Sequence, residues 1–233
     1  MCTLEKRGKI FILTLTGAGE HRLNPMLLDE VQSALRRVRD ESISSPSSAL
    51  ITTAQGKFFS NGYDLDWAGS SPSRSQLMVS KLESLVANLI SLPMPTIAAV
   101  SGHASAGGFI LALSHDYILM RKDRGFLYMS ELDINLVNLA WFMALIECKI
   151  GSPMTRRHLV LTAAKVTAKE AVEKGIIDSA QDNAEETVKA ALRLGEELER
   201  GEWNGHVYAQ IRMNLLSGVL DEIAKRRSSR SRM

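Results

Sequence analysis

Two glycine-marked turns constrain the fold of this chain more than any other feature. The first lies in residues 58–65 (FFSNGYDL), after a strand-like segment, and contains Gly62. The second contains Gly107 and Gly108 and opens an apolar stretch expected to form a buried helix. Glycine allows left-handed backbone conformations and close approach between two backbones. Each turn can therefore aim a backbone N–H at one carbonyl oxygen, and two such donors form an oxyanion hole.

Strand-like and helix-like segments alternate over most of the chain. Strands are predicted at residues 9–15, 49–53, 96–100 and 117–120, because these segments are short, apolar and rich in β-branched residues. A helix is predicted to begin at Asn24-Pro25, with asparagine as its N-cap and proline in its first turn. This alternation predicts an α/β layer built from βαβ units.

The last third of the chain is predicted to be helical. A capping box occupies residues 167–170 (TAKE), and helices are predicted over 182–200 and 203–224. Nearer the middle, residues 70–75 (SSPSRS) are predicted to be a mobile loop that precedes a helix over 77–92. The predicted organisation is a core over residues 1–175, a helical region over 176–226 and a basic tail over 227–233.

The composition excludes several classes of protein. With 233 residues, a net charge of +2 and 6% aromatic residues, the chain does not have the composition of a nucleic-acid-binding or membrane-surface protein. No apolar run approaches the ~20 residues that a membrane span needs. Cys2 and Cys148 form no disulfide framework, so a reducing compartment is expected. The five histidines lack metal-binding spacing, and no metal site is predicted.

Three segments resemble, in order, the motifs of the crotonase (enoyl-CoA hydratase/isomerase) superfamily. They are residues 21–25 (HRLNP), 59–65 (FSNGYDL) and 99–108 (AVSGHASAGG), similar to the first CoA-contacting turn and the two oxyanion loops. The resemblance extends to about Gly175 and implies an α/β fold with a crotonase-like ββα superhelix core and a C-terminal helical trimerisation region. Residues 125–134 (GFLYMSELDI) are most similar to the plant peroxisomal Δ3,Δ2-enoyl-CoA isomerases.

The resemblance also implies roles for individual residues. The backbone N–H groups of Tyr63 and Gly107 correspond to the oxyanion-hole donors, and Glu131 corresponds to the acid/base carboxyl. Hydratases of the family carry a second glutamate at the position of Ile110, whose side chain cannot transfer a proton. The residues expected to bind substrate are Arg22, Leu23, Ser60, Asn61, Gly62, Asp64, Leu65, Ala106, Gly108, Ile110 and Trp141.

A single carboxylate beside an apolar side chain suits an allylic proton shift better than hydration, which also requires a water molecule to be placed. Glu131 would remove the C2 proton of a 3-enoyl-CoA while negative charge moves to the thioester oxygen. It would then return the proton to C4 and give 2-trans-enoyl-CoA. Apolar neighbours such as Leu127, Met129 and Leu132 are expected to raise the pKa of Glu131. No cofactor is expected, because coenzyme A is part of the substrate.

Alternatives remain open at this point. Taken alone, Glu131 is more typical of a surface carboxylate, and Gly62 of an ordinary turn glycine. A dienoyl-CoA isomerase would share the fold but normally recruits further acidic groups, and a non-catalytic acyl-CoA-binding homologue would keep the fold without turnover. Residues 135–139 lack a proline or glycine common in similar isomerases, and Ala106 stands where many carry glycine. Asp133 is expected to be structural.

The C-terminal tripeptide Ser-Arg-Met at 231–233 has the small–basic–apolar pattern of the Ser-Lys-Leu peroxisomal address. Together with the resemblance, this pattern predicts a peroxisomal enzyme in the β-oxidation of unsaturated fatty acids, recognised by the peroxisomal import receptor. The resemblance further implies a homotrimer or hexamer. Acyl-CoA is the expected ligand, and neither nucleic acid nor a membrane span is expected.

Overall fold

The structure is a computed structural model that describes residues 1–17, 19–42, 48–201 and 203–230. Within these residues, the main sheet has six strands in the order β1-β2-β3-β5-β7-β9. Strands β1 and β2 pair antiparallel, and every later pair in this sheet is parallel. The strands are β1 (Cys2–Arg7), β2 (Ile10–Leu15), β3 (Ala49–Ala54), β5 (Thr96–Val100), β7 (Tyr117–Arg121) and β9 (Ser179–Gln181).

A smaller parallel sheet lies beside the main one and has the order β4-β6-β8. Each of its strands follows directly after a main-sheet strand, so β3 leads to β4, β5 to β6 and β7 to β8. A helix follows each pair, which gives three successive ββα turns and confirms the predicted superhelix. The strands are β4 (Phe58–Ser60), β6 (His103–Ser105) and β8 (Leu127–Tyr128).

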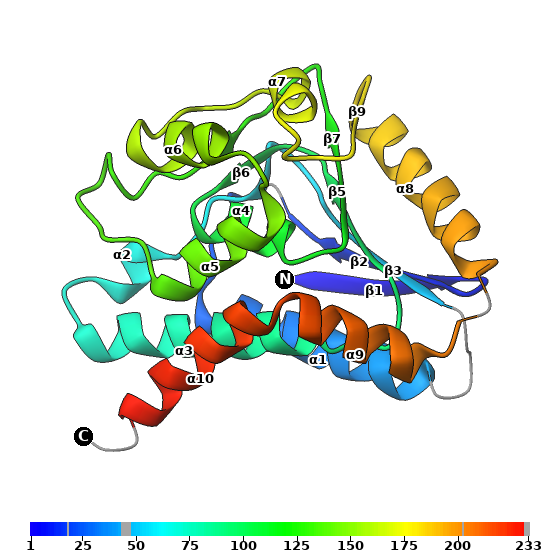
Figure 1. Cartoon of the computed structure of the whole chain (residues 1–233), viewed down its shortest axis with the longest axis horizontal. Coiled ribbons are helices and arrows are strands. Elements are labelled where there is room, and N and C mark those ends of the chain that lie inside the picture. The colour runs from blue at the N-terminus through cyan, green and yellow to red at the C-terminus, as the bar shows by residue number, and fades with distance from the viewer. Residues whose placement is uncertain (18, 43–47, 202, 231–233) are drawn as a thin grey trace.

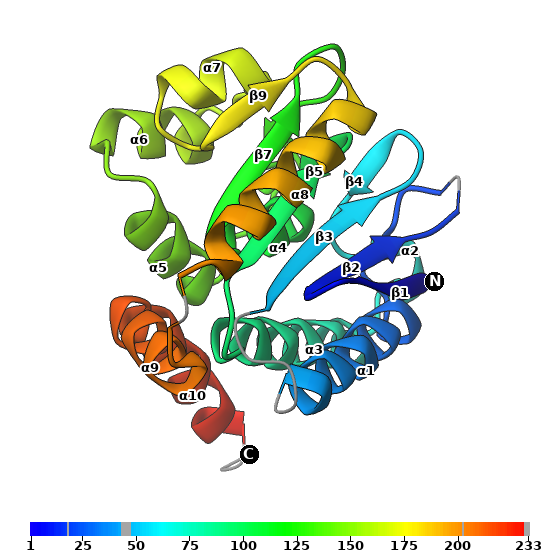
Figure 2. The ribbon, with the colours of Figure 1, turned by 90° about the vertical axis from the view of Figure 1, so that its right-hand side faces the viewer.

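Helices cover both faces of the main sheet, as Figures 1 and 2 show. Side chains on β2 alternate between the faces with the two-residue period of a strand. Phe11 and Leu13 join the main core with α1 and α3, whereas Ile10 and Ile12 pack in a second cluster against α8. The helices on these faces are α1 (Pro25–Ser42), α3 (Pro72–Ile90) and α8 (Ala184–Glu199).

The other helices surround the small sheet and the C-terminal side of the molecule. In Figure 1, α10 lies alongside α5 and α3, and residue contacts confirm both of these neighbours. None of the helices that the structure describes is both long and apolar enough to cross a bilayer. The helices are α2 (Leu65–Ala68), α4 (Gly107–Leu113), α5 (Ala140–Lys149), α6 (Pro153–Leu161), α7 (Ala168–Glu173), α9 (Gly205–Leu215) and α10 (Ser217–Arg230).

The predicted mobile loop at 70–75 is wrong, because helix α3 begins inside it. The Ser71 hydroxyl accepts a hydrogen bond from the Arg74 N–H, and Pro72 occupies the first turn of the helix. A serine N-cap followed by proline is a strong helix start, and here it outweighs the polar composition. The single helix predicted over 203–224 is divided at Leu216 into α9 and α10.

Two further sequence predictions concern the C-terminal third. The capping box at Thr167 is confirmed by reciprocal hydrogen bonds between Thr167 and Glu170. Helix α10 continues to Arg230, so the first part of the predicted tail is helical. The tripeptide predicted as a targeting signal, residues 231–233, lies outside the described residues.

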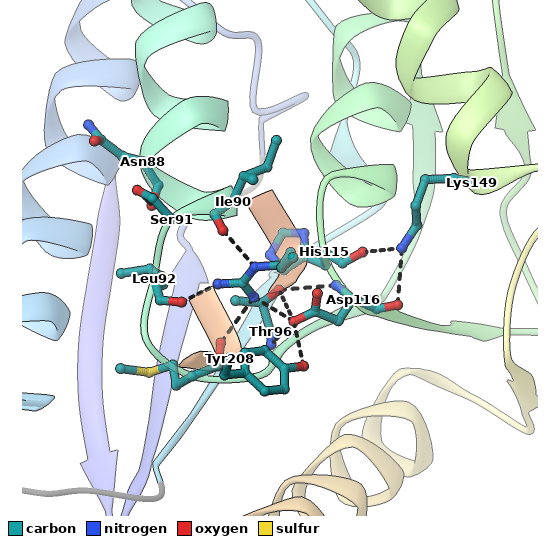
Figure 3. Close-up of polar contacts among 11 residues, drawn as sticks. Asn88, Ile90, Ser91, Leu92, Thr96, His115, Asp116, Lys149 and Tyr208 are labelled. Atoms are coloured by element: carbon teal, nitrogen blue, oxygen red, sulfur yellow. Dashed lines mark hydrogen bonds and ion pairs between the residues drawn. The ribbon is translucent and has the colours of Figure 1, made fainter. Parts of the chain in front are cut away.

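Arg212 on α9 attaches the C-terminal helices to the core through bonds to Ile90, Leu92 and Asp116, which Figure 3 labels. Its guanidinium donates to the carbonyl oxygens of Ile90 at 2.6 Å, Met94 at 3.0 Å and Leu92, and it pairs with Asp116 at 2.6 Å. The side chain of Arg212 is only 4% exposed. A buried ion pair requires such additional hydrogen bonds to offset the cost of desolvation. The end of α3 and the residues that follow it are thereby held by α9, which comes much later in the chain.

Candidate active site

Three segments leave the small sheet at the same edge and meet there. They follow β4, β6 and β8, and they contain Tyr63, Ala106 and Glu131. These three residues line one cavity together. Successive parallel strands direct their carboxyl ends to one edge of a sheet, and this explains why residues distant in sequence converge. The predicted oxyanion loops and the predicted acid/base residue are therefore neighbours.

The two glycine-marked turns touch through their backbones. Gly62 has φ of +76°, and a Cβ there would lie 3.0 Å from the Ala106 Cβ and 3.2 Å from the Gly107 nitrogen. A Cβ on Gly108 would overlap the Ser60 carbonyl and lie 2.7 Å from its carbon. A side chain at Gly108 would separate the turns, and at Gly62 the positive φ and the close neighbours both favour glycine.

Gly107 is the first residue of α4. Backbone N–H groups in the first turn of a helix have no partner within that helix. They also lie at the positive end of the helix dipole, although α4 is short. The N–H of Gly107 is thus suited to receive negative charge on a ligand oxygen.

Ala106 has a backbone conformation that alanine rarely adopts, with φ of 49° and ψ of −125°. Its N–H donates to the carbonyl oxygen of Tyr128 on β8 at 2.7 Å. Positive φ in a residue with a side chain costs free energy and persists only where surrounding contacts impose it. The alanine that departs from the family pattern therefore occupies a strained position immediately before Gly107.

The segment predicted to contact CoA packs directly on the first oxyanion loop. The N–H of Leu23 donates to the Gly62 carbonyl at 2.7 Å, and Leu23 forms an isolated parallel bridge with Tyr63. Asp64 accepts from the Trp67 N–H at 3.1 Å as the N-cap of α2, and from Asn24 Nδ2 at 3.1 Å. Both Asp64 oxygens are used in this way, which fits its expected role in shaping the loop.

Glu131 lies three residues beyond the end of β8 and is only 7% exposed. Its Oε2 atom is buried and accepts no hydrogen bond from the residues that the structure describes. Burial raises the pKa of the Glu131 carboxyl above its usual range, because the charged form loses hydration. A desolvated carboxyl at the wall of a cavity can act first as a base and then as an acid. The expected desolvation of Glu131 is present, but Leu127, Met129 and Leu132 are not among the residues that line the two cavities, and Leu132 is 52% exposed.

Two cavities meet at Glu131. The larger has a volume of about 450 Å³ and is mainly apolar; it lies between α2, α3, α5 and residues 134–139. The smaller is about 180 Å³ and opens toward Arg22 and Asn61. The residues common to both are Tyr63, Leu65, Glu131, Ile134 and Leu136. A ligand with an apolar tail on one side and polar groups on the other would pass Glu131 at the junction.

The remaining predicted substrate-binding residues have different positions. Arg22 lines the smaller cavity and pairs with Glu20 at 2.7 Å and with Asp66 at 2.6 Å. Asn61 lines the same cavity and donates to Glu20 at 2.9 Å. Ser60 is fully buried, and its hydroxyl donates to the carbonyl of residue 21 at 2.7 Å. Arg22 and Asn61 thus line the smaller cavity while bonded to neighbouring carboxylates, whereas Ser60 supports the loop from within.

Ile110 and Trp141 belong to the main hydrophobic core, with exposures of 0% and 1%. Neither is among the residues that line the two cavities. Phe142, the next residue along α5, lines the larger cavity and stacks on Tyr63 with ring centroids 6.3 Å apart. Phe142 was not predicted, because a helix register shifted by one residue changes which aromatic side chain faces a cavity.

Several further cavity residues were not predicted. They lie on α2 and α3 or in the turn between them, and their apolar members are typical of core positions in any amphipathic helix. No local signal in the sequence distinguishes them from core residues that face no cavity. They are Ala68, Gly69, Ser75, Met78 and Val79.

Other candidate groups lie away from this edge. His115 is fully buried between the Leu111 carbonyl at 2.9 Å and Thr52 Oγ1 at 2.8 Å, and burial lowers its pKa to about 4. No cluster of metal-binding side chains occurs in the described ranges. A larger surface cavity of about 670 Å³ lies beside α6 and α7 but contains none of the predicted site residues.

Comparison with known proteins supports the interpretation of the motifs. The chain matches the family model "Enoyl-CoA hydratase/isomerase" over residues 6–233. It is 63% identical to the peroxisomal enoyl-CoA delta isomerase 1 of Arabidopsis thaliana over 220 residues, which covers 94% of this chain and 91% of that protein. It is 52% identical to the peroxisomal enoyl-CoA delta isomerase 2 of the same plant over 230 residues, covering 94% and 95%.

Solved structures share the fold at lower sequence identity. An enoyl-CoA hydratase/isomerase family protein from Pseudomonas syringae superposes with a TM-score of 0.87 at 23% identity, covering 96% of this chain and 94% of that one. The enoyl-CoA hydratase EchA3 of Mycobacterium ulcerans gives a TM-score of 0.85 at 20% identity, covering 96% and 95%. From its motifs, its fold and these matches, the chain belongs to the enoyl-CoA hydratase/isomerase family.

Proposed function

We propose that this chain is a Δ3,Δ2-enoyl-CoA isomerase that converts a 3-enoyl-CoA into 2-trans-enoyl-CoA with Glu131 as its acid/base residue. The observation that carries this proposal is a single buried carboxyl at the junction of an apolar and a more polar cavity. The names of the Arabidopsis relatives support the same activity and a peroxisomal location. The substrate is a fatty acyl group joined to coenzyme A.

The two cavities suggest how the substrate binds. The acyl chain occupies the larger apolar cavity, and the thioester lies near Glu131, beside the touching turns that carry Tyr63 and Gly107. The CoA portion leaves through the smaller cavity past Arg22 and Asn61. Arg22 is always charged and is well suited to interact with phosphate oxygens. This placement keeps the reacting carbons at the buried carboxyl.

The reaction follows from this arrangement. Glu131, as a carboxylate, removes a proton from C2, and the electron pair moves through the carbonyl so that negative charge develops on the thioester oxygen. Backbone N–H groups of Tyr63 and Gly107 donate to that oxygen in the proposed oxyanion hole. Such preorganised donors stabilise the transition state by about 3–4 kcal/mol each. Protonated Glu131 then gives its proton to C4, and the double bond moves into conjugation.

The alternatives are less consistent with the site. At Ile110, where hydratases carry a second glutamate, the side chain is apolar and fully buried. Asp133, the nearest other acidic residue in the chain, is exposed and accepts a hydrogen bond from Tyr128. A second acid for hydration or dienoyl-CoA isomerisation is therefore absent from these two positions. The proposed shift needs one carboxyl and neither a metal nor a redox cofactor.

We further propose that the chain assembles into a homotrimer or hexamer. Helix α9 exposes Val207, Ile211 and Leu215, which recur every four residues and form one apolar stripe. Exposed stripes of this kind commonly mark protein interfaces. Light scattering coupled to size-exclusion chromatography tests the assembly: a mass equal to that of one chain would reject it.

The Glu131→Gln variant tests the proposed function. Glutamine keeps the size of the side chain but cannot act as a base, so kcat with cis- or trans-3-hexenoyl-CoA should fall at least about 1,000-fold. Affinity for a saturated acyl-CoA, measured by calorimetry, should stay within about threefold of wild type. As a matched control, Glu147→Gln on α5 should leave kcat unchanged.

The result also separates the alternatives. Undiminished isomerisation by Glu131→Gln would show that another group transfers the proton. Acyl-CoA binding without turnover in the wild-type protein would favour a non-catalytic homologue. Rapid hydration of crotonyl-CoA would favour a hydratase.

A further inference from the structure

We propose that Tyr128 is a positioning residue that links the oxyanion turn to the segment carrying Glu131. This inference rests on the proposed function, because it concerns the relative placement of the two reacting parts of that site. Tyr128 is the last residue of β8. This strand pairs with β6 in the small sheet, and the segment that carries Glu131 follows it in the chain. Its backbone contacts one part of the site, and its side chain contacts the other.

The backbone of Tyr128 holds the oxyanion turn. Its carbonyl oxygen accepts a hydrogen bond of 2.7 Å from the Ala106 N–H, just beyond the pairing of Ser105 with Tyr128. Ala106 has φ of 49°, so its conformation depends on external contacts. The next residue is Gly107, whose N–H is the proposed donor to the thioester oxygen. The position of β8 therefore sets the direction of this donor.

The side chain of Tyr128 holds the Glu131 segment. Its hydroxyl donates to the carboxylate of Asp133. The Asp133 N–H in turn donates to the Ser130 carbonyl at 3.0 Å, and the Leu136 N–H donates to the Glu131 carbonyl at 2.8 Å. These bonds close a compact series of turns around the buried carboxyl. Moving Asp133 would move the backbone on both sides of Glu131.

Packing alone fixes this segment only weakly. Residues 132–137 are all exposed, although Glu131 itself is buried. Segments with few buried contacts open locally at low free-energy cost. A hydrogen bond to a charged acceptor is stronger than one between neutral groups. The hydrogen bond to Asp133 raises the pKa of Tyr128 to about 12.

The ring of Tyr128 is held independently of its hydroxyl. It packs edge-on against Phe126 with centroids 6.1 Å apart, and the Lys165 ammonium lies 5.1 Å from its centroid. Tyr128→Phe therefore removes only the hydrogen bond and leaves these ring contacts in place. The backbone bond to Ala106 is also retained, so this variant isolates the connection to Asp133.

The test is a double-mutant cycle of Tyr128→Phe and Asp133→Ala, assayed with 3-hexenoyl-CoA. Each single variant should lower kcat about 10-fold with KM within about twofold of wild type. The double variant should be no slower than either single one, because both changes break the same bond. Asp133→Asn keeps an acceptor oxygen and should retain kcat within about threefold of wild type.

Tyr208→Phe is the matched control, because Tyr208 also donates to a carboxylate, that of Asp116, but lies in the α9 network of Figure 3. It should leave kcat unchanged. Hydrogen exchange gives a readout that does not depend on activity: the Leu136 amide should exchange about 10-fold faster in Tyr128→Phe than in wild type.

Three results would overturn the link between Tyr128 and Glu131. The first is that Tyr128→Phe leaves both kcat and amide exchange unchanged. The second is that the losses of kcat in the two single variants multiply in the double variant. The third is that the variants change KM but not kcat. An inactive wild-type protein would reject the proposed isomerase function instead. In that case, faster exchange at Leu136 would still support the connection between Tyr128 and Asp133, and unchanged exchange would reject it.

Discussion

The turns that carry Gly62 and Gly107 meet the segment that carries Glu131 at one edge of the small sheet, yet the two regions are fixed differently. The turns are held by direct backbone contact, to the point that Gly62 and Gly108 have no room for a side chain. Beyond Glu131, residues 132–137 are exposed and depend on turn hydrogen bonds. Changes in the turns should therefore affect stability, and changes in the Glu131 segment should affect rate.

Gly108→Ala should produce the largest effect on stability. Its Cβ would overlap the Ser60 carbonyl, which belongs to a strand and cannot move freely. We expect unfolding free energy to fall by about 4 kcal/mol or more, or expression to fail. Urea unfolding measures the loss. Gly151→Ala is the control, because a Cβ there meets nothing within 4 Å. A loss below about 1 kcal/mol at Gly108 would contradict a rigid contact between the turns.

The pH dependence of kcat tests the region that carries Glu131. Burial raises the pKa of Glu131, and the base must be ionised, so the rate should fall about tenfold per pH unit below that raised pKa. The acidic limb should thus lie above the ordinary glutamate value of about 4.3. A pH–rate profile measures it. An acidic limb at or below the ordinary value would contradict a desolvated base.

The raised pKa of Glu131 also makes the free energy of unfolding depend on pH. Between the unfolded and the raised folded pKa, the folded protein binds more protons than the unfolded protein. Stability contributed by Glu131 therefore decreases as pH rises through this window. Glu131→Gln should be more stable than wild type at neutral pH, and this difference should vanish below pH ~4. Chemical denaturation at both pH values checks the sign.

Ala106→Gly should have the smallest effect, and it should raise the free energy of unfolding rather than lower it. Glycine adopts φ of 49° without strain, whereas its greater freedom in the unfolded chain costs part of the gain. We expect a net stabilisation of about 1 kcal/mol, measured as a rise in Tm. A loss of stability would indicate that contacts of the Ala106 methyl group outweigh the strain.

Local chemistry was enough to predict much of the fold. The Asn24 side chain accepts from the Leu27 N–H at 3.0 Å, as its position before Pro25 predicted, and Thr167 forms the predicted capping box. The predicted strands at 49–53 and 96–100 are present as β3 and β5. Caps and buried strands are predictable because short stretches of sequence determine them.

The residues that line the cavity were less predictable, because tertiary packing decides which apolar side chains face the cavity and which are buried in the core. Met78 and Val79 continue the α3 stripe, and nothing local separates them from core residues. Phe142 rather than Trp141 reaches the cavity, a difference of one helical position. Glu131 was identified through family resemblance; the residue type and its neighbours alone were more typical of an exposed carboxylate.

The Arg212 network also bears on how the protein is made. The carbonyl of Ile90 obtains this partner from a residue 122 positions later. During synthesis at about 5–20 residues per second, that stretch of backbone emerges from the ribosome several seconds before the arginine that binds it. The main sheet can form early, but its connection to α9 must wait until Arg212 has been synthesised. A chain truncated before residue 212 should consequently remain a target for chaperones and proteases.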